Sequence, residues 1–217
     1  MLDSADMWVK ICGTTNLEDA VAAVDAGADA VGFVFAPSSR RIHPKDVARI
    51  TPAVPREVEK IGVFVNQQSS IILDTVKKTG LTGVQLQGDE TPEFARQLKA
   101  AQPSLKVIKT IHMGEQQLAE LDSKQMGIYD ALLFDSGTKE NRGGTGKTFD
   151  WQAGAFLIRS LSRQFRIIIA GGLRSSNVGE AIELFRPAGV DVVSGVEQKL
   201  GKKDPAKIRA FIAAARR

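Results

Sequence analysis

Short apolar runs recur along the whole chain and are separated by longer segments with a different pattern. The runs consist mostly of Val, Ile, Leu and Phe and are bounded by glycine or polar residues, which is typical of buried strands. We predict eight such strands, over Val9–Cys12, Ala30–Phe35, Lys60–Val65, Gly83–Gln87, Lys106–Ile111, Ala131–Asp135, Arg166–Ala170 and Asp191–Val196.

The segments between these strands have the spacing of apolar residues that is typical of amphipathic helices. Several follow helix start signals, such as Thr15-Asn16-Leu17-Glu18 and Asp204-Pro205. We predict helices over Leu17–Ala26, Pro44–Thr51, Ser69–Thr79, Pro92–Ala101, Gln116–Gln125, Asp150–Ser162, Asn177–Phe185 and Pro205–Ala215.

The regular alternation of strands and helices predicts the fold class. No linker or change in composition divides the 217 residues, so we expect one α/β domain over residues 1–217. Eight strand–helix units in a chain of this length favour a closed (β/α)8 barrel, also called a TIM barrel. A doubly wound open sheet is disfavoured, because it usually has fewer strands and a glycine fingerprint after the first one. Here Cys12-Gly13-Thr14-Thr15 follows the first strand instead.

Alternation along each strand indicates which side chains face the barrel axis. The outer face of a barrel strand packs on helices and should be apolar, so we assign the polar face to the interior. This predicts that the following side chains surround the axis: Lys10, Cys12, Gln85, Gln87, Lys109, Asp135 and Asp191. Two lysines and two aspartates in this set would balance each other's charge, which buried ions require.

Cys12 and Asp135 each lie where a predicted strand ends, and that end of the barrel carries catalytic residues in this fold. A thiolate can remove a proton from carbon, and a carboxylic acid can donate one to oxygen, so the pair suits a proton-transfer isomerisation without a cofactor. Lys10 shares a face with Cys12, and we hypothesise that its charge favours the thiolate. The alternatives are a small buried Cys12 and a turn role for Asp135, since Ser136-Gly137 follows it.

Two glycine-containing turns, Gly171-Gly172 and Ser194-Gly195, follow or end the last two predicted strands. Backbone N–H groups of such turns bind phosphate at this place in the fold, although each could be only a tight turn. Arg41 could bind a carboxylate or phosphate, or could be a solvated surface residue. The segment from Arg142 to Thr148 is interpreted as a lid over the barrel mouth, with a plain surface loop as the alternative.

Composition and charge narrow the function classes. The net charge is +4, and seven basic residues fall near the end of the chain: Lys199, Lys202, Lys203, Lys207, Arg209, Arg216 and Arg217. Because no nucleic-acid-binding motif accompanies them, we interpret these residues as a solvated helix face and expect no nucleic-acid partner. One cysteine and no long apolar run predict a cytoplasmic protein without a disulfide or membrane span. Neither His43 nor His112 has ligand partners at metal spacing, so no metal site is predicted.

Several motifs taken together resemble one family, phosphoribosylanthranilate isomerase of tryptophan biosynthesis. The likeness extends almost from end to end of the chain. It is carried by Val9-Lys10-Ile11-Cys12-Gly13, Gly27-Ala28-Asp29-Ala30-Val31-Gly32-Phe33, Gly62-Val63-Phe64-Val65-Asn66, Val84-Gln85-Leu86, Gly143-Gly144-Thr145-Gly146-Lys147-Thr148-Phe149-Asp150-Trp151, Ala170-Gly171-Gly172-Leu173 and Asp191-Val192-Val193-Ser194-Gly195-Val196-Glu197.

The resemblance implies a single (β/α)8 barrel and a cofactor-free Amadori rearrangement. In that reaction N-(5-phosphoribosyl)anthranilate becomes 1-(2-carboxyphenylamino)-1-deoxyribulose 5-phosphate. By resemblance, Asp135 is the general acid at the furanose ring oxygen and Cys12 is the general base at C2. Arg41 matches the position that meets the anthranilate carboxylate, and Gly172 with Ser194-Gly195 matches the phosphate site.

One position departs from the family pattern. The family commonly has histidine after Val-Gln-Leu, where this chain has Gln87. An amide can donate a hydrogen bond but does not change charge near neutral pH, so we predict that Gln87 orients groups rather than transferring protons. We also assign Asp191 to substrate binding.

Three further points stay open at this stage. Another sugar-phosphate isomerase on the same barrel, such as the histidine-pathway relative, is the alternative enzyme. Such relatives typically use two aspartates, so Cys12 disfavours them. A phosphometabolite-binding protein without catalysis is the alternative outside enzymes. The oligomeric state is not determined by the sequence, and we favour a monomer.

Overall fold

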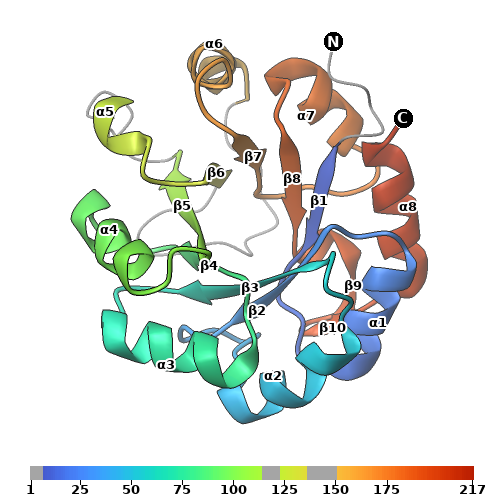
Figure 1. The fold of residues 1–217 in the computed structure, drawn as a ribbon. Helices are drawn as coiled ribbons and strands as arrows, with labels where there is room; N and C mark the ends of the chain where they lie inside the picture. Colours follow the sequence, from blue (N-terminus) through green and yellow to red (C-terminus); the bar gives the residue numbers. More distant parts are fainter. Residues whose placement is uncertain (1–6, 114–122, 136–150) are drawn as a thin grey trace.

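The computed structural model describes residues 7–113, 123–135 and 151–217. Eight parallel strands form a closed barrel in the order β1-β2-β3-β4-β5-β6-β7-β8, so β1 pairs with both β2 and β8. Figure 1 shows the helices surrounding this barrel. The predicted (β/α)8 architecture is confirmed.

The strands are short, and most are buried on both faces, because side chains fill the barrel inside while helices pack outside. Their bounds are β1 Trp8–Ile11, β2 Ala30–Val34, β3 Glu59–Phe64, β4 Gly83–Leu86, β5 Lys106–His112, β6 Ala131–Asp135, β7 Ile167–Ile169 and β8 Gly189–Val192. Most predicted bounds were within one or two residues. The last strand was predicted too far along the chain, because Ser194–Val196 forms a 3-10 turn instead.

Three of the helices in the described parts of the chain begin at a residue whose side chain caps them, namely Asn16, Thr91 and Asp204. Asn16 accepts a hydrogen bond from Asp19 N at 2.9 Å, and Asp204 accepts from the first turn of its helix. The bounds are α1 Leu17–Asp25, α2 Pro44–Ile50, α3 Ser69–Thr79, α4 Pro92–Ala101, α5 Ser123–Met126, α6 Trp151–Leu161, α7 Val178–Phe185 and α8 Pro205–Ala215. The first part of the helix predicted over Gln116–Gln125, and the predicted lid, lie outside the described residues.

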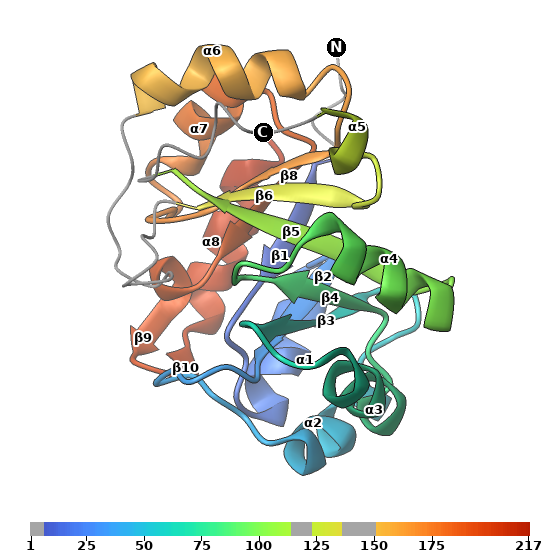
Figure 2. The same cartoon turned by 90° about the vertical axis from the view of Figure 1, so that its left-hand side faces the viewer.

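A small antiparallel hairpin, β9 Glu197–Lys199 with β10 Lys202–Lys203, follows β8 and was not predicted. Figure 2 shows it beside the barrel, before the chain enters α8. The segment is charged and has no apolar alternation, so nothing in its pattern indicates strands. It also corrects the interpretation of the terminal basic residues as a solvated helix face, because Lys203 is in β10 and is 0% exposed.

The barrel interior has an apolar layer beneath the polar one. Eight buried residues form an apolar cluster inside the barrel, separate from the larger core under the helices: Trp8, Ala30, Ile61, Ile108, Ala131, Leu133, Ile168 and Ala170. Ile108 in this cluster corrects the predicted orientation of β5. Ile108 and Thr110 face inward, while Lys109 Nζ donates to Gly88 O at 2.6 Å and pairs with Glu90 at 3.2 Å.

The error at Lys109 has a physical reason. Both faces of β5 carry a polar residue, so polarity alone does not identify the inner face. Glu90 lies in the loop after β4 and offers a carboxylate that the long lysine side chain reaches. The predicted balance of two interior lysines and two aspartates is therefore wrong, and Lys10 is the lysine that stays inside.

Candidate active site

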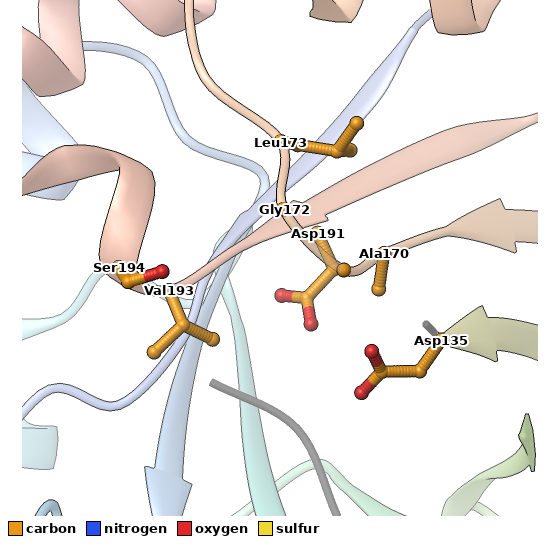
Figure 3. A pocket seen from close by; sticks show the side chains of 8 residues that line it. Asp135, Ala170, Gly172, Leu173, Asp191, Val193 and Ser194 are labelled. Atoms are coloured by element: carbon orange, nitrogen blue, oxygen red, sulfur yellow. The ribbon is translucent and has the colours of Figure 1, made fainter. Parts of the chain in front are cut away.

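A pocket opens at the carboxyl ends of β6, β7 and β8, which is the end of the barrel that carries active sites in this fold. Figure 3 shows the carboxyl groups of Asp135 and Asp191 pointing into it. Its lining residues are Asp135, Ala170, Gly171, Gly172, Leu173, Asp191, Val193 and Ser194. Three of the four residues of the two predicted glycine turns, Gly171, Gly172 and Ser194, thus line one pocket together with the predicted catalytic residue Asp135.

The turns after β7 and β8 approach each other so closely that glycine is required at Gly195. A Cβ at Gly195 would lie 1.9 Å from Leu173 O, a contact that no other residue could make without moving backbone. Gly171 and Gly172 have φ of +88° and +67°, in the left-handed region that favours glycine. Two backbone turns held in contact in this way form a concave surface of the kind that binds phosphate through N–H groups.

Cys12 follows β1 and its thiol points into the barrel. A Cβ on Gly32, an inward position of β2, would lie 2.6 Å from Cys12 Sγ and 2.9 Å from Lys10 Cε. Gly32 therefore makes room for both side chains. Cys12 is only 4% exposed, so its side chain is buried, and it is not among the residues that line the pocket.

The charges around Cys12 oppose each other. Burial raises the pKa of the Cys12 thiol and Asp191 raises it further, whereas the ammonium groups of Lys10 and Lys203 lower it. The net pKa is raised, so the thiol form predominates in the free protein near neutral pH. The hypothesis that Lys10 favours the thiolate thus has the right sign for that one interaction, but burial outweighs it.

Lys10 is completely buried and lies between two acceptors. Its Nζ donates to Gln85 Oε1 at 2.9 Å and to Asp191 Oδ1 at 3.0 Å. Burial by itself would lower the pKa of the Lys10 ammonium, but Asp191 and Cys12 outweigh burial and the net pKa is raised. Lys10 is therefore a permanent cation beside the thiol.

The ammonium of Lys10 fixes the orientation of two amides. Because an ammonium only donates, the oxygen of Gln85 must face it, which leaves Gln85 Nε2 to donate to Gln87 Oε1 at 2.6 Å. Gln87 Nε2 then donates to Asp135 Oδ2 at 3.3 Å. In this series of hydrogen bonds each residue donates to the next one, from Lys10 beside Cys12 to Asp135.

Two residues of β5 complete this network and were missed in the sequence because the inner face of β5 was assigned wrongly. Thr110 Oγ1 donates to Gln87 Oε1 at 2.8 Å. His112 Nε2 lies 3.1 Å from the backbone oxygen of Gln87, which only accepts, so this nitrogen carries the proton. An inner face defined by Thr110 and His112 would have been the correct choice.

Arg41 and Arg40 are neighbours in the sequence but lie in different environments. The side chain of Arg41 is exposed and does not line the pocket. Arg40 is buried, and its Nε and terminal nitrogen donate to the two carboxylate oxygens of Glu197 at 2.7 and 2.8 Å. This bidentate pair fixes the loop after β2 to the hairpin after β8. Arg40 and Glu197 were not singled out in the sequence, where only their charge was visible.

Two negative findings apply to the described parts of the chain. No group of three or more His, Cys, Asp or Glu side chains there is arranged to hold a metal ion. Within the same ranges, no helix has both the length and the apolar character needed to cross a membrane.

Comparison with known proteins gives one consistent family. Residues 9–214 match the family described as N-(5'-phosphoribosyl)anthranilate (PRA) isomerase. The N-(5'-phosphoribosyl)anthranilate isomerase of Desulforudis audaxviator is 45% identical over 208 residues, which cover 96% of this chain and 97% of that protein.

Solved structures agree with the sequence comparison. The crystal structure of phosphoribosyl anthranilate isomerase from Thermotoga maritima is similar with a TM-score of 0.84 and 43% identity, covering 96% of this chain and 98% of that one. A second structure, of such an isomerase in complex with reduced 1-(o-carboxyphenylamino)-1-deoxyribulose 5-phosphate, has a TM-score of 0.82 and 39% identity over the same shares.

Proposed function

The chain belongs to the N-(5'-phosphoribosyl)anthranilate isomerase family, and we propose that it converts N-(5-phosphoribosyl)anthranilate to 1-(2-carboxyphenylamino)-1-deoxyribulose 5-phosphate with Asp135 as general acid and Cys12 as general base. Membership of this family makes the protein an isomerase of tryptophan biosynthesis.

The observation that carries the proposal is the arrangement at the carboxyl ends of the strands. Asp135 and the two glycine turns border one pocket. The Cys12 thiol interacts with Lys10, and hydrogen bonds lead from Lys10 through Gln85 and Gln87 to Asp135. We infer that a phosphate bound on the turns lets the attached sugar reach both the acid and the thiol. A relative that holds the reduced product analogue supports the same class of ligand.

The opening of the ring and the formation of the enolamine need one proton transfer each, and the two groups suit one each. Protonation of the furanose ring oxygen by Asp135 lets the bond from C1 to that oxygen break, with the nitrogen lone pair forming the C1–N double bond of a Schiff base. Removal of the C2 proton by Cys12 then returns electrons to nitrogen and gives an enolamine. This enolamine tautomerises to the C2 ketone, so no external oxidant, reductant or cofactor is consumed.

The remaining predicted site residues have positioning roles in this proposal. Gln87 donates to Asp135 and so holds the carboxyl group in one orientation. Asp191 holds the ammonium of Lys10 beside the thiol. Arg41, exposed at the loop after β2, is proposed to bind the anthranilate carboxylate when substrate is present. Cytoplasmic location and a monomeric state stay predictions.

The test is direct turnover. Freshly prepared N-(5-phosphoribosyl)anthranilate is fluorescent, and we expect its fluorescence to decay on mixing with catalytic amounts of the protein, with the aminoketose as the product. A folded protein that leaves the fluorescence at its background decay would overturn the proposal. Saturable binding of the substrate without decay would instead favour a phosphometabolite-binding protein.

A further inference from the structure

Lys203 lies in the hairpin after β8 and is 0% exposed, although it is outside the barrel strands. Its Nζ donates to the backbone oxygen of Cys12 at 2.6 Å, to that of Val193 at 2.9 Å, and to Glu197 Oε1 at 3.5 Å. One side chain thus contacts the residue that carries the candidate base and the residue before the Ser194-Gly195 turn.

These contacts require the charged form of Lys203. Three acceptors take three N–H groups, which an ammonium has and a neutral amine does not. Burial lowers the pKa of this ammonium more than Glu197 and Cys12 raise it, and the nearby Arg40 lowers it further, so the net pKa is lowered. A buried cation is unfavourable unless it is paired and hydrogen-bonded, so its presence here needs a reason in the structure it supports.

Lys203 lies just beyond the point where the pairing of β1 with β8 ends. The regular pairing of these strands ends at Ile11 with Val192, and Cys12 N still donates to Val192 O at 2.9 Å. Beyond that bond, β8 turns into the 3-10 turn and offers no further partner strand. The Lys203 ammonium bridges the next two carbonyls, of Cys12 and Val193, where the sheet itself no longer connects them.

The surroundings hold Lys203 in place from both ends. Its backbone N donates to Asp19 Oδ2 in α1 at 2.9 Å, which fixes the main chain. Glu197, one of its acceptors, itself accepts hydrogen bonds from Nε and one terminal nitrogen of Arg40. Because these partners are buried and mutually bonded, the ammonium has a defined position rather than the freedom of a surface lysine.

We propose that Lys203 is a positioning residue, which fixes the end of β1 that carries Cys12 relative to the turn that binds the substrate phosphate. The inference rests on the proposed function for its catalytic consequence. If it is correct, Lys203 sets the distance between the phosphate and the base, and its charge also acts on the thiol. Displacing a reacting group by about 1 Å can reduce the rate on the order of 100-fold.

The charge of Lys203 provides a readout that does not depend on turnover. The groups that act on the Cys12 thiol are Lys10 of β1, Asp191 of β8, Lys203 of β10 and Arg40 of the loop after β2. Lys203 lowers the pKa of the thiol, so its removal should raise it. Cys12 is the single cysteine of the chain, so a thiol titration reports this residue alone.

The experiment compares Lys203→Met and Lys203→Gln with Lys202→Met as the matched control. Lys202 is the neighbouring residue of the same strand, but its partly exposed ammonium pairs with the exposed Glu18 at 2.7 Å and, at the longer distance of 3.5 Å, with the buried Asp19. Each folded variant is titrated through the ultraviolet absorbance of the thiolate and assayed for kcat and KM. Lys203→Gln keeps a polar side chain in the buried site, so the test remains possible if Lys203→Met does not fold.

We expect both substitutions at Lys203 to raise the thiol pKa, to lower kcat about tenfold or more, and to raise KM, while Lys202→Met resembles the wild type. Folded variants with a lower melting temperature but an unchanged thiol pKa would overturn the proposal, because that is the pattern of a merely structural lysine. An unchanged kcat and KM would overturn it too. If the wild type itself does not turn over the substrate, the proposed function fails, and the titration still decides whether Lys203 acts on Cys12.

Discussion

Cys12 and Asp135 have separate roles in the proposed chemistry. Replacing either residue alone should therefore lower kcat, and by a similar factor in the two variants. Cys12→Ser keeps the size of the side chain but replaces the thiol by a much weaker acid, and Asp135→Asn removes the ionisable proton. We expect each to lower kcat by about 100-fold or more. Steady-state kinetics checks this, and a kcat within a few fold of the wild type in either variant would remove that residue from the mechanism.

The charge of Lys10 is predicted to act on the thiol even though burial dominates the net shift. Lys10 lowers the pKa of Cys12, so Lys10→Met should raise that pKa and slow alkylation of the thiol at neutral pH. Lys60→Met is the matched control, because Lys60 is also buried but donates to Pro55 O and Val58 O at the other end of the barrel. Equal thiol titrations in the wild type and Lys10→Met would exclude Lys10 as an activator.

Gln87 is predicted to orient Asp135 without titrating. Gln87→Leu removes the donor to Asp135 Oδ2, and we expect kcat to fall about tenfold, as for loss of one supporting hydrogen bond, while the shape of the pH–rate profile is unchanged. Gln97→Leu on the exposed face of α4 is the control. In Gln87→His, a new limb in the profile near neutrality would show instead that a group at this position can transfer protons.

At the scale of the element, Gly32 in β2 is the position where strand packing and chemistry meet. Its missing side chain leaves room for Cys12 Sγ and Lys10 Cε, so Gly32→Ala should destabilise the fold by about 1–3 kcal/mol through overpacking and lower kcat by displacing the thiol. Gly179→Ala in α7 is the control, because its Cβ would meet nothing within 4 Å and alanine favours helix. Urea unfolding measures the free energy of unfolding of both variants. A Gly32→Ala variant as stable as Gly179→Ala would contradict the close approach at β2.

The elements also show how far the sequence predicts the structure. Long periodic helices such as Ser69–Thr79 were predicted to the residue, because the apolar stripe and the left-handed Gly80 that ends this helix are local signals. The inner face of β5 was not, because Lys109 and Thr110 are both polar and the partners that decide between them lie on β4 and the loop after it. The hairpin at Glu197–Lys203 escaped prediction because its stability comes from contacts of buried charges rather than from an apolar pattern.

At the scale of the whole molecule, closure of the barrel is what brings residues distant in the sequence to one end. Cys12 and Asp135 could be proposed as a pair from the sequence, because each is the last residue of a predicted strand and the two strands belong to one predicted barrel. The supporting groups could not, because Lys203 reaches the backbone of Cys12 from a distance of 191 residues along the chain. In the sequence Lys203 could not be distinguished from a surface lysine, because only the fold shows that its side chain is buried.

The most direct test of the account is a crystal structure of this protein with reduced 1-(o-carboxyphenylamino)-1-deoxyribulose 5-phosphate, the ligand of a similar isomerase. We predict that the phosphate contacts the Gly172 and Gly195 turns, that Asp135 faces the oxygen derived from the ring, and that C2 lies within about 3.5 Å of Cys12 Sγ, the separation of groups poised to react. A bound analogue whose C2 faces away from the sulfur, or whose phosphate lies elsewhere, would contradict it.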